Sequence, residues 1–200
     1  MILQNIFDSL SKAFFQTTFT EWLIFITALL YVILAAIENV WCWLFGIISS
    51  ALYIYFCYSG KLFLESGLNL FYVIIGIYGW YLWLYGSKEK TESKIISISF
   101  TKNIYLIIIA CLIWIPFGYI AYHFSTQAMP YLDAFITAFS LIATWMTAKK
   151  ILQNWLYWIV IDALAIALYA YRSFYLSALL YSIYTLLALA GYIRWKKKTT

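Results

Sequence analysis

Two tryptophans and an aspartate share one helical face in the stretch SLIATWMTAKKILQNWLYWIVID, residues 140–162. A first apolar helix ends near Lys150, and a second begins almost at once. At about 100° per residue, Trp155, Trp158 and Asp162 fall on the same side of the second helix. We therefore expect two indole rings and a carboxylate to face one neighbour or one ligand.

Asp162 lies within a segment that the apolar pattern predicts to span a membrane. An ionisable group there costs roughly 2.5–3.5 kcal/mol on insertion scales, so it is a functional-site hypothesis by default. Three roles stay open. The carboxylate balances a cationic ligand, it bonds to a neighbouring helix as polar groups in membranes do, or it takes part in gating.

The composition sets the class of protein. Hydrophobic residues make up 66% of the 200 residues and charged residues only 10%, which is more apolar surface than a soluble domain of this size can bury. The aromatic content of 22% exceeds what interfacial belts need, so some rings are expected to line a cavity. The net charge of +5 is assigned to basic ends and loops facing a cytoplasmic leaflet, without a nucleic-acid role.

No metal or cofactor is expected, because the three cysteines are scattered along apolar segments without ligand spacing. An enzyme is not expected either. The single histidine, His123, is predicted to lie near the outer end of a span, and no nucleophile and base come together.

Seven apolar spans are predicted, which makes this an all-α membrane protein. Their approximate bounds are 22–37, 40–58, 68–86, 104–122, 131–148, 155–171 and 174–195. Lys61, Glu65 and Gly67 are assigned to the loop after the second span. The domain prediction is an N-terminal interfacial segment 1–21, a three-helix bundle 22–86, a cytoplasmic loop 87–103, a linking transmembrane helix 104–123, a second bundle 131–195 and a basic cytoplasmic tail 196–200.

Lys and Arg are distributed unevenly between the two predicted sides. One side carries Lys12, Lys61 and Arg172, and the other carries the remaining ten. By the positive-inside rule, the N-terminus is expected outside and the C-terminus in the cytoplasm.

An internal repeat explains the odd number of spans. At an offset of 115 residues, Asn39 aligns with Asn154 and Trp43 with Trp158. At an offset of 112, the aligned pairs are Tyr72 with Tyr184, Gly76 with Ala188, Gly79 with Gly191 and Trp83 with Trp195. Two three-helix units joined directly would point opposite ways, and an intervening span restores a parallel 3-1-3 arrangement. Transporter sites commonly lie between such repeats.

Further residues are expected to line a site between the repeats. They are Asn69 and Tyr72 on the third span, Tyr181 and Tyr184 on the seventh, and a stripe of Asp133, Thr137, Ser140 and Thr144 on the fifth. For the fifth span an alternative stays open, because hydroxyls of a helix in lipid often bond only to their own backbone. Flat, electron-rich rings beside amides and one buried carboxylate suit a planar cation that carries hydroxyl groups.

Several runs resemble the PnuC family of vitamin transporters. They include NVWCWLFGIISSALYIYF, NLFYVIIGIYGWYLW, the stretch from Tyr131 to Asp162 and the tail YRSFYLSALLYSIYTLLALAGYIRWKKK, so the resemblance covers roughly residues 20 to 198. It implies facilitated diffusion of nicotinamide riboside across the bacterial inner membrane, with trapping by a cytosolic kinase. It also implies two SWEET-type three-helix bundles joined by an extra helix, and a homotrimer.

The same resemblance suggests which residues bind the substrate. It implies Trp155 and Trp158 as aromatic contacts, with Asn154 and Asn39 as polar contacts. Tyr72, Tyr184 and Trp43 are assigned on the internal repeat instead. Some relatives take thiamine or riboflavin, and thiamine is also an aromatic cation, so another vitamin remains an alternative substrate. A membrane sensor or assembly subunit is a further alternative.

Overall fold

The structure is a computed structural model, and it describes residues 11, 14–59, 63–86, 94–124 and 128–199. Most of the predicted interfacial segment, and the hydrophilic stretch 87–93, lie outside the described residues. The helices in order are α2 (Phe19–Ala36), α3 (Cys42–Ser59), α4 (Phe63–Tyr85), α5 (Phe100–Phe124), α6 (Pro130–Ala148), α7 (Asn154–Tyr171) and α8 (Tyr175–Lys196).

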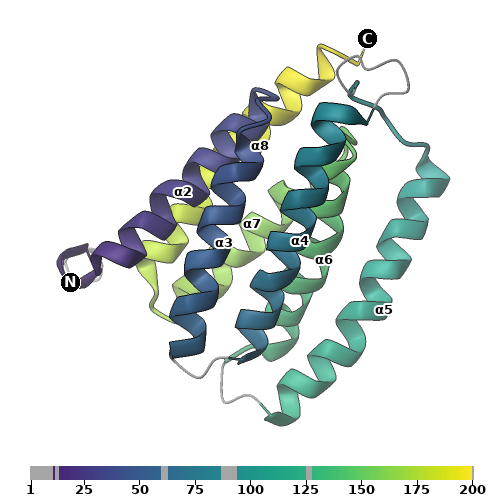
Figure 1. Cartoon of the computed structure of the whole chain (residues 1–200). Coiled ribbons are helices and arrows are strands. Elements are labelled where there is room, and N and C mark those ends of the chain that lie inside the picture. The colour runs from purple at the N-terminus through teal and green to yellow at the C-terminus, as the bar shows by residue number, and fades with distance from the viewer. Residues whose placement is uncertain (1–10, 12–13, 60–62, 87–93, 125–127, 200) are drawn as a thin grey trace.

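The described chain is an all-helical membrane protein (Figure 1). Six of these helices are long and apolar enough to cross a bilayer, and the apolar stretch of α3, Cys42–Tyr58, is slightly shorter. The predicted bounds mostly agree with the helices to within a few residues. The loop assignment of Glu65 and Gly67 is wrong, because α4 begins at Phe63 and includes both. A glutamate in the first turn of a helix is favourable, so its charge did not mark a loop.

The bounds of α6–α8 reproduce those of α2–α4 to within one residue at a single offset of 112 residues. α3 and α7 both have 18 residues, and both their first and their last residues are 112 apart. The preceding turns also match. Glu38 and Lys150 both have positive φ, at 60° and 50°, and each donates its backbone N–H to the carbonyl three residues earlier.

The offset of 115 is therefore wrong for the start of the middle helices. Trp43 corresponds to Trp155, and the position equivalent to Trp158 is Gly46. The two tryptophans also have the same surroundings. A Cβ added at Gly79 would overlap the Trp43 ring, and one added at Gly191 would lie 2.7 Å from Trp155 Cε2.

The two helix groups contact each other through two pairs of helices. α4 packs against α6, and α8 packs against α2. The Trp83 indole N–H donates to the carbonyl of Thr147 (3.3 Å), and that of Trp195 donates to the carbonyl of Ala35 (3.2 Å). Because Ala35 and Thr147 are also 112 residues apart, the same bond is made twice in opposite directions.

α5 stands apart from both groups and packs only against α6 among the described helices (Figure 1). The helix continues through Pro116. The segment before it is fastened to the α6–α7 turn, because Ile96 donates to the Lys150 carbonyl (3.0 Å) and accepts from Leu152 N (2.8 Å).

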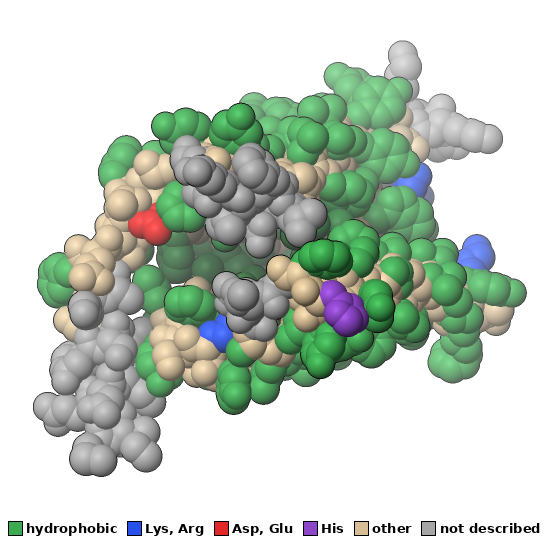
Figure 2. Space-filling model, turned by 90° about the horizontal axis from the view of Figure 1, so that it is seen from below, with side chains coloured by type: hydrophobic (Ala, Val, Ile, Leu, Met, Phe, Trp, Pro, Cys, Tyr) green, Lys and Arg blue, Asp and Glu red, His purple; other side chains and the backbone are tan. Residues whose placement is uncertain are grey.

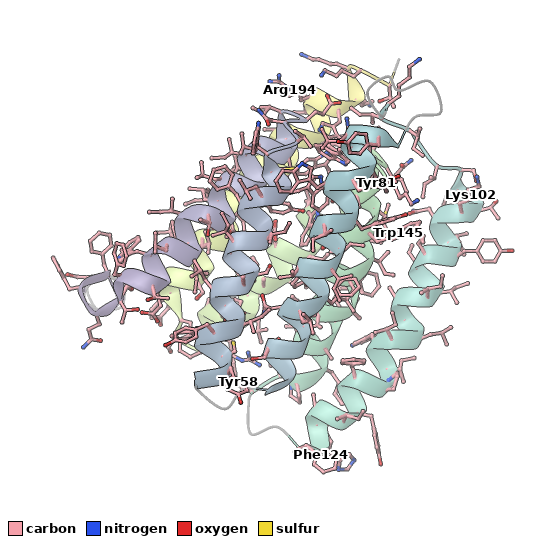
Figure 3. All side chains as sticks on the ribbon, in the orientation of Figure 1. Tyr58, Tyr81, Lys102, Phe124, Trp145 and Arg194 are labelled. Carbon is pink, nitrogen blue, oxygen red and sulfur yellow. The ribbon has the colours of Figure 1, made fainter. Side chains whose placement is uncertain are left out.

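Basic residues gather at one end of the described chain. Arg194 and Lys102 lie at the upper end in Figure 3, and Tyr58 and Phe124 lie at the lower end. The upper end also has an ion pair between the equivalent turns, with the buried Lys150 Nζ 3.8 Å from the Glu38 carboxylate. Lys198, a half-exposed residue after α8, pairs with the same carboxylate at 2.5 Å. At the lower end, Arg172 pairs with Asp133 at 2.9 Å.

Candidate substrate-binding site

A cavity of about 340 Å³ lies between the two helix groups. Its walls come from α2, α3 and α4 on one side and from α6, α7 and α8 on the other. In the described residues α3 and α7 do not contact each other, so the cavity separates the two middle helices. Seen from below, a recess lies among hydrophobic side chains near the centre of the molecule (Figure 2).

Most of the predicted site residues meet in this cavity. The predicted site residues that line it are Trp43, Asn69, Tyr72, Thr144, Trp155, Trp158, Asp162, Tyr181 and Tyr184. Asn39 and Asn154 are not among its lining residues. The Asn39 side chain lies in the turn after α2, where its Oδ1 accepts from Trp41 N at 3.0 Å.

Asn154 instead lies behind the cavity lining and is bonded to residues that support it. It is fully buried, and its amide donates to the Ile151 carbonyl at 2.7 Å. The Thr147 hydroxyl shares its proton between the Ala143 carbonyl (2.9 Å) and Asn154 Oδ1 (3.1 Å), and it accepts from the Trp158 indole N–H (3.4 Å). This chain fixes the orientation of the Trp158 ring, so Asn154 acts on the cavity through Thr147.

Four indoles lie between the cavity and the basic end. Trp43 meets Trp83 edge-on (centroids 5.6 Å apart), Trp83 meets Trp195 (6.1 Å), and Trp195 meets Trp155 edge-on (5.4 Å). Lys150 Nζ lies 4.6 Å from the centre of the Trp83 ring, which joins this cluster to the ion pair with Glu38. Trp43 and Trp155 thus belong both to the cavity lining and to this tryptophan cluster.

Asp162 is the one charged residue among the described residues that line the cavity. It is only 3% exposed, and no ion pair of the described chain includes it. The equivalent position in the first helix group, Ser50, also lines the cavity but carries no charge. The acidic side chain therefore lies on one side of the cavity only.

We expect Asp162→Asn to weaken binding of a cationic vitamin and to leave binding of a neutral analogue of the same shape nearly unchanged. Only the charged ligand gains from a carboxylate in a low-dielectric cavity. Titration of the parent and of the Asn and Ala variants with both ligands measures this. Equal losses for the two ligands in the Asn variant would contradict charge pairing. If the role is structural, the Asn variant should behave like the parent, and the Ala variant should have a lower thermal stability.

Several lining residues were missed by the sequence analysis. They are Tyr31 on α2 and Gly46, Ser49 and Ser50 on α3. With the offset of 112 carried through the first turn, Gly46 and Ser50 would have been found opposite Trp158 and Asp162. Of the polar stripe on α6, Ser140 and Thr144 line the cavity, whereas Asp133 lies at the lower end with Arg172.

A cavity lined in part by aromatic side chains, between the helices of a polytopic membrane protein, is typical of a small-molecule transporter. Residues 18–197 match the family model described as "Nicotinamide mononucleotide transporter", and the chain belongs to this family. It is a family of membrane transporters and not of enzymes.

Relatives and a solved structure agree with this assignment. The chain is 25% identical over 195 residues to the nicotinamide riboside transporter PnuC of Escherichia coli, covering 85% of this chain and 82% of that one. It is 29% identical to the protein of the same name from Neisseria mucosa, covering 86% and 70%. It is 24% identical to the riboflavin/roseoflavin transporter RibM of Streptomyces davaonensis, covering 79% and 75%. The crystal structure of a vitamin B3 transporter PnuC superposes with a TM-score of 0.73 at 26% identity, covering 98% of this chain and 89% of that chain.

Proposed function

We propose that the chain carries nicotinamide riboside across the bacterial inner membrane through the cavity between its two helix groups. One observation carries the proposal. The cavity combines aromatic walls with a single carboxylate, Asp162, and nicotinamide riboside is a flat cation with a hydroxyl-bearing sugar. Two of this chain's relatives are named as nicotinamide riboside transporters.

The size and charge of the cavity favour this substrate over riboflavin. Small-molecule sites span about 300–1,000 Å³, and a cavity of about 340 Å³ is near the lower limit. A nucleoside with one six-membered aromatic ring suits that space better than a neutral three-ring flavin does. Riboflavin stays the second candidate because one relative is named as its transporter.

The proposed architecture is two parallel three-helix repeats, α2–α4 and α6–α8, joined by α5 in a SWEET-like 3-1-3 arrangement of seven spans. The constant offset of 112 residues and the reciprocal Trp83 and Trp195 hydrogen bonds support it. Alternating access would then proceed by rocking of one repeat against the other.

The proposed orientation has the basic end in the cytoplasm and the N-terminus outside. Eight of the Lys and Arg residues in the described chain belong to the basic end, and Arg172 belongs to the opposite end. A homotrimer belongs to the same proposal. The wide apolar surface of α5, which packs against one helix of its own chain, is available for such contacts.

We expect uncoupled transport, followed by trapping of the product by a cytosolic kinase. Asp162 is the one acid of the described residues at the cavity, which leaves few groups to bind and release a coupling ion. In proteoliposomes, a nicotinamide riboside gradient alone should drive flux in both directions. Collapse of the membrane potential should alter the flux only through the charge of the substrate. Accumulation well beyond the level set by the potential would refute uncoupled transport.

A further inference from the structure

At two pairs of equivalent positions, one helix group has a large aromatic residue and the other has a small residue. On α7, Trp158 projects from a site whose equivalent on α3 is Gly46. On α2, Tyr31 occupies a site whose equivalent on α6 is Ala143. One repeat therefore combines tyrosine with glycine, and the other combines alanine with tryptophan.

The Tyr31 ring packs directly on the small residue of its own repeat, and the Trp158 ring packs against the cluster that contains the other small residue. A Cβ added at Gly46 would lie 2.9 Å from Tyr31 Cδ2, so the tyrosine ring covers the glycine directly. Trp158 packs against the hydrophobic cluster that contains Ala143. Each wall of the cavity thus carries one aromatic ring, Tyr31 against α3 and Trp158 on α7.

The rings belong to opposite walls, because α3 and α7 do not contact each other in the described residues and the cavity separates them. Both Tyr31 and Trp158 line it. A flat ligand between them would have one aromatic face on each side, and offset aromatic pairs contribute beyond their buried area.

Trp158 and Tyr31 differ in how they are held. Trp158 is oriented by its hydrogen bond to Thr147. The buried Tyr31 hydroxyl makes no hydrogen bond within the described residues. The ring of Tyr31, and not its hydroxyl, is therefore what the surrounding protein positions, through contacts with Gly46 and with Trp43 (centroids 5.8 Å apart).

We infer that Tyr31 is the second aromatic wall of the substrate site and that Gly46 is small in order to admit it. This inference rests on the proposed function only in requiring a flat aromatic ligand. It assigns Tyr31 a specificity-determining contact equivalent to that of Trp158, supplied from a different helix of the repeat.

The test is a binding titration of the purified full chain and four variants with nicotinamide riboside, thiamine and riboflavin. Tyr31→Ala should weaken binding at least about tenfold, as expected for a lost stacking face, and Tyr31→Phe should stay within about threefold. Gly46→Trp alone should also lose binding, because the new side chain collides with Tyr31. The double variant Tyr31→Ala with Gly46→Trp copies the arrangement of Ala143 and Trp158 and should recover most of the lost affinity.

The outcomes separate this inference from the proposed function. If the parent binds thiamine or riboflavin in preference to nicotinamide riboside, the proposed substrate is wrong, and the variants are judged with the vitamin that binds. Unchanged affinity in Tyr31→Ala would overturn the inference, and so would a double variant that folds with the parent's unfolding temperature yet binds no better than Gly46→Trp. A parent that binds none of the three overturns both proposals.

Discussion

Gly79→Val is expected to destabilise the protein strongly, whereas Gly67→Val is expected to have little effect. Both glycines lie in α4, so both substitutions carry the same change in helix propensity. A Cβ at Gly79 would overlap the ring of Trp43, which is 1% exposed and held edge-on by Trp83. Overpacking of such a site costs about 1–3 kcal/mol, and more where the neighbour cannot move.

Gly67 is a matched control because a Cβ there meets nothing within 4 Å. The measurement is the thermal unfolding midpoint in detergent, followed by intrinsic fluorescence. Equal midpoints for the two variants would show that the close approach of α4 to Trp43 does not hold the first helix group together. Gly191→Val should resemble Gly79→Val, because Gly191 faces Trp155 in the same way.

Trp158→Ala should weaken binding of the substrate by roughly 1–3 kcal/mol through lost stacking area and lost cation–π attraction. That range corresponds to about 5- to 150-fold in the dissociation constant. Trp158→Phe should keep more than half of the binding free energy that Trp158→Ala loses, because it keeps an aromatic face in the cavity. Calorimetric titration of the purified variants measures both.

Trp41→Ala is the control for this series. Trp41 is 53% exposed, packs edge-on against Trp80 and is not among the residues that line the cavity. Its loss should leave affinity unchanged. If Trp158→Ala and Trp158→Phe both bind like the parent, the Trp158 ring serves packing and the site lies elsewhere.

Hydropathy located the helices because each apolar run is long and its ends carry charged or polar residues. It misplaced the start of α4, where Glu65 and Gly67 were assigned to a loop although they belong to the first turns of a helix. The family resemblance and the chemistry of the WLYWIVID run led to Trp155, Trp158 and Asp162, which do line one cavity.

The repeat alignment failed where identical residue types stood at the wrong positions. Asn39 matches Asn154 and Trp43 matches Trp158 by letter, but the helix bounds and turns pair Trp43 with Trp155 and Asn39 with Ile151. A turn with positive φ at Glu38 and Lys150 carries no glycine or shared letter that would have fixed the register.

Asn154 and Tyr31 illustrate what one sequence cannot supply. Asn154 precedes the first indole and has the expected chemistry, yet it satisfies the turn and Thr147 instead of lining the cavity. Tyr31 lies in a helix without a polar stripe, so no periodicity marks it. Its importance emerges only when the structure brings its ring over Gly46, opposite Trp158.

A structure determined with nicotinamide riboside at saturating concentration would show where the substrate binds. We expect the ligand in the cavity between the two helix groups, with its pyridinium ring against Trp158 and its positive charge on the side of Asp162. Ligand bound outside this cavity would contradict the account, and so would an empty cavity that riboflavin or thiamine fills under the same conditions.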